Sequence, residues 1–88
     1  MSSEAQSPLA KRLREARKNT GFTQEQLGIK AGLDEVVVSA RMSQYENSVH
    51  TPDFSFIKKV ATVLGLPTAY FYCEEDELAE VIKTFNKE

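Results

Sequence analysis

One stretch decides the fold of this 88-residue chain: Gly21-Phe22-Thr23-Gln24-Glu25-Gln26-Leu27-Gly28-Ile29-Lys30-Ala31-Gly32-Leu33. Thr23 is a good N-cap residue, because its hydroxyl can accept a hydrogen bond from a backbone N–H of the first helical turn. Leu27 and Ala31 lie four residues apart and give a helix an apolar face. Gly32 can adopt the left-handed conformation in which many helices end. We therefore predict a helix over about 23–31 closed by a glycine turn, which is how a helix-turn-helix begins.

A second helix is expected after the turn 32–34, with Asp34 as its N-cap. The run Val36-Val37-Val38 at its start is β-branched, so a short strand is conceivable there. Helix is favoured, because Val38, Met42 and Tyr45 continue at helical spacing and form an apolar stripe. The predicted helix spans about 35–46. In a helix-turn-helix pair, such a helix can enter the major groove of DNA.

The other apolar positions also repeat at helical spacing, so the predicted fold class is all-α. Ser7 as cap and Pro8 in the first turn start a helix over about 8–19, after a disordered arm over 1–7. Further helices are expected after Pro52, after Pro67 and over about 76–86. The prediction is a five-helix domain over 8–72 and an acidic C-terminal helix within 73–88. Its expected core holds Leu13, Leu27, Val38, Tyr45, Ile57 and Leu64.

The composition excludes several functional classes. Cys73 is the only cysteine and His50 the only histidine, so neither a disulfide nor a metal site is expected, and no cofactor is implied. Cys73 is expected to be an inert, partly buried thiol. No apolar stretch approaches the ~18 residues that span a bilayer, and a reducing cytoplasm fits best. No catalytic triad and no glycine-rich phosphate loop appear, so the chain is not expected to be an enzyme.

Charge is distributed unevenly along the chain. The net charge is −2, but residues 1–44 carry +2 and residues 45–88 carry −4. The basic residues cluster at Lys11, Arg12, Arg14, Arg17 and Lys18, and the acidic ones at Glu74, Glu75, Asp76, Glu77 and Glu80. Either one end of the molecule faces phosphate while the other is kept away from it, or both clusters are solvated helix faces.

The chain resembles the lambda-repressor-like helix-turn-helix family (Cro/cI type, or xenobiotic-response-element type) of bacterial regulators. The resemblance covers about residues 9–71 and rests on spaced motifs at 13–17, 21–27, 43–47, 51–53 and 57–67: LREAR, GFTQEQL, SQYEN, TPD and IKKVATVLGLP. One feature departs from the family pattern. About four extra residues separate Gly32 from Tyr45, and they either lengthen the turn or extend the recognition helix at its N-terminal end.

The resemblance implies that the chain binds double-stranded DNA through a set of polar residues. Gln24 at the start of its helix is a candidate phosphate contact, since helix N-termini attract anions. Ser39, Arg41 and Gln44 are candidates for reading bases, and arginine and glutamine can bond guanine and adenine edges bidentately. Asn47 and Thr51, in the loop where His50 also lies, are expected near the DNA backbone. Two further phosphate candidates are Arg12 and Arg17, although Arg17 could instead pair with Glu46.

A homodimer is expected, because dimers of this family bind two half-sites about 34 Å apart. The candidate interface consists of Tyr70, Phe71, Leu78, Val81, Ile82 and Phe85, although the aromatics could be buried and the last helix could merely complete the core. The leading functional hypothesis is a repressor that occupies an operator. The alternative is a protein-interaction module, such as an antitoxin or a regulatory partner, that binds another protein through its C-terminal helix.

Overall fold

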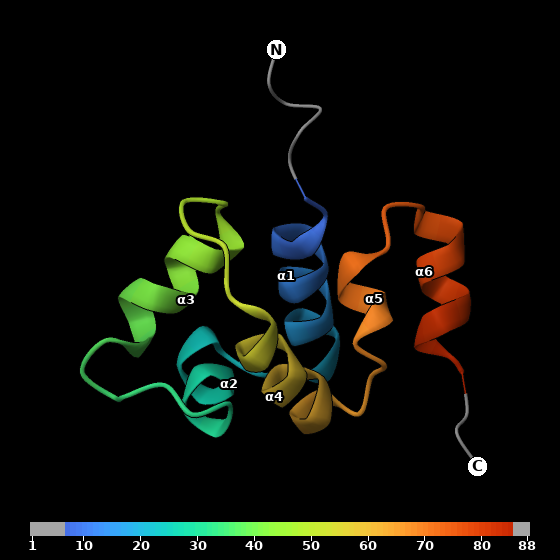
Figure 1. The fold of residues 1–88 in the computed structure, drawn as a ribbon. Coiled ribbons are helices and arrows are strands. Elements are labelled where there is room, and N and C mark those ends of the chain that lie inside the picture. Colours follow the sequence, from blue (N-terminus) through green and yellow to red (C-terminus); the bar gives the residue numbers. More distant parts are fainter. Residues whose placement is uncertain (1–6, 86–88) are drawn as a thin grey trace.

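The computed structural model describes residues 7–85 and contains six helices within that range, with no strand, so the all-α prediction is confirmed. The helices are α1 (Leu9–Thr20), α2 (Gln24–Lys30), α3 (Val38–Glu46), α4 (Phe54–Leu64), α5 (Ala69–Tyr72) and α6 (Asp76–Lys83). Most of the predicted arm over 1–7, and residue 86 of the predicted last helix, lie outside the described residues. In Figure 1, α3 and α6 lie on opposite sides of α1.

Local capping signals start three of the helices where the sequence predicts them. The Ser7 hydroxyl accepts a hydrogen bond from the Leu9 N–H at 2.9 Å, which starts α1. Thr23 and Gln26 form a reciprocal capping box at the start of α2, each side chain accepting from the other's backbone N–H. The Asp53 carboxylate accepts from the Phe56 N–H at 2.9 Å and starts α4. These caps satisfy N–H groups that a helix end leaves free.

The third helix begins at Val38, so the prediction that it starts near residue 35 was wrong, and so was the suggestion of a strand. Asp34 caps a tight turn instead: its carboxylate accepts from the Val36 N–H at 2.9 Å, and its carbonyl accepts from the Val37 N–H at 3.0 Å. The extra residues therefore lengthen the turn. Gly32, with φ of +101°, begins this turn in a conformation that favours glycine.

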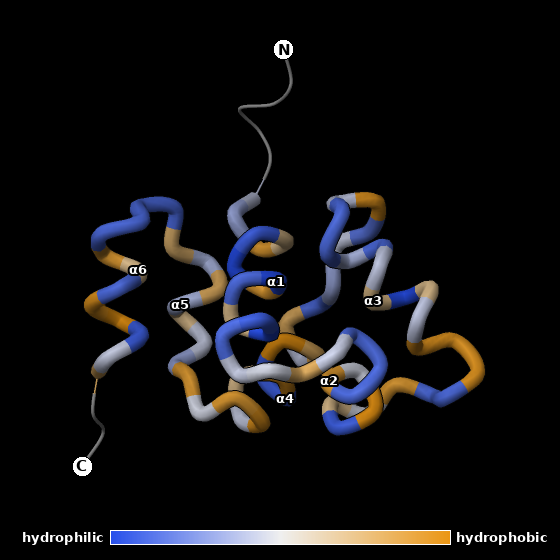
Figure 2. Tube along the Cα trace, turned by 180° about the vertical axis from the view of Figure 1, so that it is seen from behind, coloured by the Kyte–Doolittle hydropathy of each residue, from blue (hydrophilic) through white to orange (hydrophobic). Residues whose placement is uncertain are grey.

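The core lies where α1 to α5 meet. Leu13, Leu27, Val38 and Ile57 are completely buried, as predicted, whereas Tyr45 and Leu64 are only partly buried against the same cluster. Gly28 lets α2 and α3 approach closely, because a Cβ there would lie 2.3 Å from a methyl of Val38. Figure 2 shows hydrophobic and hydrophilic residues alternating along the turns of α1 and α6. Among the described helices, none is both long and apolar enough to span a membrane.

Candidate nucleic-acid interface

A buried carboxylate fixes the C-terminal end of α3. Glu46 is 1% exposed, and both of its oxygens are bonded to Arg17 of α1, at 2.6 and 3.0 Å. Gln24 of α2 donates to the same carboxylate at 3.0 Å, and Arg14 donates to the Glu46 carbonyl at 2.9 Å. A bidentate arginine–carboxylate pair is directional as well as strong. Glu46 therefore joins the helix-turn-helix pair, α2 and α3, to α1.

The polar face of α3 is open to solvent. Ser39 and Arg41 are exposed and Gln44 is half-buried, while Val38 and Met42 of the same helix are completely buried. Arg41, Gln44 and Tyr45 line a shallow hollow together with His50 and Thr51 of the following loop. The structure thus brings two of the predicted base-reading side chains and the predicted loop residue Thr51 to one place. Neither Arg41 nor Gln44 has a side-chain hydrogen bond among the contacts of the described residues.

The loop after α3 folds back onto the end of that helix. The N–H groups of Val49 and His50 both donate to the Gln44 carbonyl, at 2.9 and 3.3 Å. Ser48 has φ of +62°, in the left-handed region that non-glycine residues rarely adopt. The Asn47 side-chain amide donates to the carbonyl and the hydroxyl of Ser43, at 2.8 and 3.4 Å, so it is engaged within the helix end. These backbone hydrogen bonds keep the loop that carries His50 and Thr51 beside α3.

Arg12 is not available as a phosphate contact, which corrects the prediction. Its side chain is 2% exposed and donates to the carbonyls of Cys73 and Glu74 and to the carboxylate of Asp76. Arg17 is likewise engaged, in its alternative role as partner of Glu46, and its side chain is 13% exposed. Both arginines belong to the basic cluster of α1. The sequence did not reveal their burial, because their main acceptors lie far along the chain.

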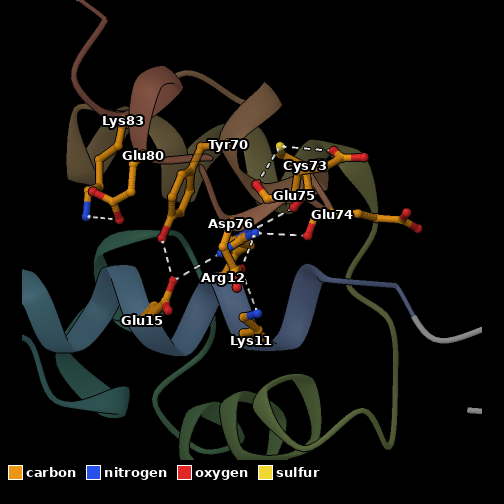
Figure 3. A network of polar contacts seen from close by, with 10 residues as sticks. All are labelled: Lys11, Arg12, Glu15, Tyr70, Cys73, Glu74, Glu75, Asp76, Glu80 and Lys83. Atoms are coloured by element: carbon orange, nitrogen blue, oxygen red, sulfur yellow. Dashed lines mark hydrogen bonds and ion pairs between the residues drawn. The ribbon is translucent and has the colours of Figure 1, made fainter. Parts of the chain in front are cut away.

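Arg12 belongs to a polar network, shown in Figure 3, that joins α1 to the start of α6. Hydrogen bonds from Lys11 at 2.8 Å and from Arg12 at 3.0 Å hold the pKa of the Asp76 carboxyl below its ordinary value. Tyr70 donates to the Glu15 carboxylate at 3.1 Å. Burial, and then the neighbouring charge of Glu15, raise the pKa of Tyr70 to about 12. The network clamps the acidic segment onto α1.

Two of the predicted dimer residues are interior. Tyr70 and Phe71 are 1% and 0% exposed and pack edge-on with ring centroids 5.1 Å apart, so they contribute to the core and not to a surface. Three of the other four lie on α6, and Phe85 follows the end of that helix. Ala79 of α6 is buried and Ile82 is half-buried, whereas Leu78 and Val81 form an exposed apolar stripe on the helix and Phe85 is exposed beyond it.

Sequence reasoning missed two features of this surface. Arg14, which lies in the basic cluster, holds the end of α3 through the Glu46 carbonyl. Val36 is 89% exposed at the turn that leads into α3, although valine is usually a core residue. The sequence contained a signal for the exposure of Val36, because three successive residues cannot all lie on the buried side that Val38 occupies.

Comparison with known proteins agrees with this geometry. The sequence profile of a family described as "Helix-turn-helix domain" matches residues 10–77. The chain belongs to this family. Its fold is the lambda-repressor-like arrangement that the motifs implied. The family consists of DNA-binding regulators and not of enzymes. The match runs from the second residue of α1 to the second residue of α6.

Two solved structures are similar to this helix-turn-helix chain. A crystal structure of the transcriptional regulator BswR is 49% identical, has a TM-score of 0.80, and the match covers 85% of this chain and 74% of that one. The N-terminal DNA-binding domain of SinR from Bacillus subtilis is 26% identical, has a TM-score of 0.66, and the match covers 77% of this chain and 94% of that one. No curated protein matches the chain.

Proposed function

We propose that this chain is a sequence-specific regulator of transcription that binds double-stranded DNA, and that it acts as a dimeric repressor. One observation carries the proposal: α3 of the helix-turn-helix pair presents exposed polar side chains on the side opposite its buried residues. The similarity to a DNA-binding domain and to a transcriptional regulator supports the same function.

Base readout is assigned to α3. Arg41 has the fork of donors that matches the O6 and N7 of guanine, and Gln44 has the amide that matches adenine N6 and N7. Ser39 is exposed at the N-terminal end of the helix, which in this motif meets the base edges. Sequence preference therefore comes from these three side chains.

Phosphate contacts are assigned to the two ends of the helix pair. Gln24 is the first residue of α2, where free N–H groups and the helix dipole attract an anion. Thr51 and Asn47 flank the loop that folds back on α3, and both are exposed. Such contacts fix the register of a protein on the duplex and supply most of the salt-dependent affinity.

Dimerisation is assigned to the exposed stripe of α6. Leu78 and Val81 are three residues apart, so they lie on one side of the helix, and the exposed Phe85 follows its end. They are 49%, 64% and 64% exposed, which leaves an apolar strip uncovered in the single chain. Two strips from two copies would cover one another, and a dimer on an operator would block access of the polymerase.

The first test is selection of bound sequences from random duplex DNA at near-physiological salt. We expect a palindromic motif for the unchanged protein. In Arg41→Ala and Gln44→Ala, the preference at one position of each half-site should weaken, because each bidentate contact distinguishes bases by about 1–3 kcal/mol. Lys58→Ala is the control, since this exposed cation lies on α4, outside α3 and the stripe of α6, and should leave the motif unchanged.

Absence of an enriched motif with folded protein would contradict the proposal. The apolar stripe of α6, which is bordered by acidic residues, then favours the second function: a module that binds another protein through this helix, as an antitoxin or regulatory partner does. The two functions differ in what changes when Val81 is replaced. Protein binding is lost in the second case, and operator binding in the first.

A further inference from the structure

The turn before α3 carries a small apolar surface at its tip. Val36 is 89% exposed and Val37 is 36% exposed, and Ala40 in the first turn of α3 is also exposed. We refer to Val36, Val37 and Ala40 as the valine tip. In Figure 2 this turn is drawn largely in orange at the edge of the molecule opposite α6.

The valine tip is held in a defined position. The Asp34 carboxylate and carbonyl accept from the N–H groups of Val36 and Val37, at 2.9 and 3.0 Å. The Val37 carbonyl in turn accepts from the Arg41 N–H at 2.9 Å, and the next side chain, Val38, is completely buried. Val36 is therefore presented outward by a fixed turn, because its neighbours on both sides are tied down.

The charges of the turn argue against a contact with the DNA backbone. Asp34 and Glu35 are both exposed, and carboxylates repel phosphates. An acidic turn that projects from the start of a recognition helix is better tolerated over the floor of the groove than along its phosphate rim. At the floor of the major groove the turn meets base edges, and its exposed valine is the group that can gain from the contact.

The major groove offers one apolar group to such a side chain. Thymine carries a C5-methyl there, whereas the other bases present hydrogen-bond donors and acceptors. An isopropyl group placed against that methyl removes apolar surface of both partners from water, and no hydrogen bond is left unmade. Cytosine at the same place has only a hydrogen at C5, so the valine loses the methyl contact.

We propose that Val36 is a specificity-determining residue that selects thymine at one position of each half-site by packing against its C5-methyl group. The inference rests on the proposed function, since it needs α3 to lie in the major groove. It assigns to the inserted turn a base contact that adds to those of Arg41 and Gln44. The acids beside Val36 then lower overall affinity without changing the preferred base.

The test removes the methyl group from the DNA. Each thymine of the selected operator is replaced in turn by deoxyuridine, which differs only in lacking that methyl. Binding is measured by fluorescence anisotropy with the full chain. We expect a loss of about fourfold per half-site at one thymine, the change that corresponds to one methyl group withdrawn from a buried apolar contact. In Val36→Ser, replacement of that same thymine should have no effect.

Two further variants separate readout from charge and from general apolarity. Glu35→Gln should strengthen binding to all sequences alike, because it removes a repelling charge and no base contact. Ile29→Ser changes another exposed aliphatic residue, 43% exposed on α2, and should keep the full deoxyuridine penalty. Circular dichroism and thermal unfolding establish that the variants are folded.

Three results would overturn the inference, and they are distinguishable. If the protein selects a motif but every deoxyuridine replacement is silent, no methyl is read. If Val36→Ser keeps the same penalty as the unchanged protein, another residue reads the methyl. If the folded protein selects no motif at all, the proposed function fails and the role of Val36 fails with it.

Discussion

At the scale of single residues, Glu46 determines how α3 is held. Its carboxylate is bonded to Arg17 of α1 and to Gln24 of α2, and its carbonyl to Arg14 of α1. A buried ion pair contributes little net stability by itself, because both charges lose their hydration. Removal of one partner is costly, since the other charge remains in the interior without compensation.

Glu46→Gln should therefore lower the free energy of unfolding by about 3 kcal/mol, because Arg17 then keeps its charge without a counterion. Urea denaturation followed by circular dichroism measures this difference. Glu25→Gln, an exposed change on α2, is the control and should stay within about 0.5 kcal/mol. A Glu46 variant as stable as the control would show that the pair does not anchor the helix.

Gly28 gives a second residue-scale prediction. In most helix interiors, glycine to alanine is favourable by about 1 kcal/mol. Here a Cβ would lie 2.3 Å from Val38 and 2.9 Å from Met42, so Gly28→Ala should instead destabilise the protein by about 1–3 kcal/mol through overpacking. Thermal unfolding measures the sign. In a Val38→Ala background the same substitution should cost less, because the methyl nearest to the new Cβ is gone.

At the scale of elements, a polar clamp joins α5 and α6 to α1. The guanidinium of Arg12 lies 5.7 Å from the ring centroid of Tyr70 and donates to groups at the start of α6. The phenol of Tyr70 closes the network through Glu15. Arg12 also donates to the carbonyls of Cys73 and Glu74, in the chain between the two short helices.

The raised pKa of Tyr70 predicts an alkaline limit for this clamp. The folded chain keeps the phenol protonated up to about 12, against an ordinary pKa of 10.0. Its stabilising contribution is complete below pH 10 and is lost as the pH rises toward 12. The free energy of unfolding should fall more steeply over this range for the unchanged protein than for Tyr70→Phe. Equal slopes would contradict the assignment, and tyrosinate absorbance gives an independent reading.

The sequence predicted those elements whose signals are local. Thr23 and Asp53 cap helices through N–H groups three residues away, and the apolar stripes of α1 and α4 lie within single helices. It could not predict the partners of Arg12, which lie more than 60 residues along the chain. Asp34 was wrongly predicted to be the N-cap of α3. An aspartate carboxylate accepts a hydrogen bond from a nearby backbone N–H both in a turn and at the start of a helix, so the sequence does not distinguish the two.

The predicted site residues show the same difference between local and tertiary signals. Arg41, Gln44 and Thr51 came together because they follow one another on a helix and its loop. Tyr70 and Phe71 were placed at an interface, since exposure of an aromatic residue depends on whether α1 covers it, and that is decided by the tertiary fold.

At the scale of the whole molecule, the two proposed surfaces lie on opposite sides. α3 and α6 are separated by α1 and α5 in both ribbon views, so the acidic segment is held away from the side that would face DNA (Figures 1 and 2). This arrangement lets a pair of chains join through α6 while both recognition helices stay free.

Replacing Val81 by glutamate should separate the two copies, because it puts a charge into the apolar stripe of α6. Light scattering coupled to size exclusion measures the change from dimer to monomer. Affinity for a two-half-site operator should drop at least a hundredfold, toward that for one half-site, as linked binding is lost. Ala69→Glu adds the same charge at an exposed position of α5 and should leave the dimer intact. A monomeric unchanged protein would contradict the assignment.

The bonds of Glu46 anchor α3 at its C-terminal end. Its last residue is bonded to α1 and α2, whereas at its start, within the described part of the chain, no side chain caps the free N–H groups. Amide hydrogen exchange should therefore run fastest at the reading end of the helix and slowest toward Glu46. DNA that accepts hydrogen bonds from those free N–H groups would slow their exchange, so binding at the reading end should appear as protection of these amides.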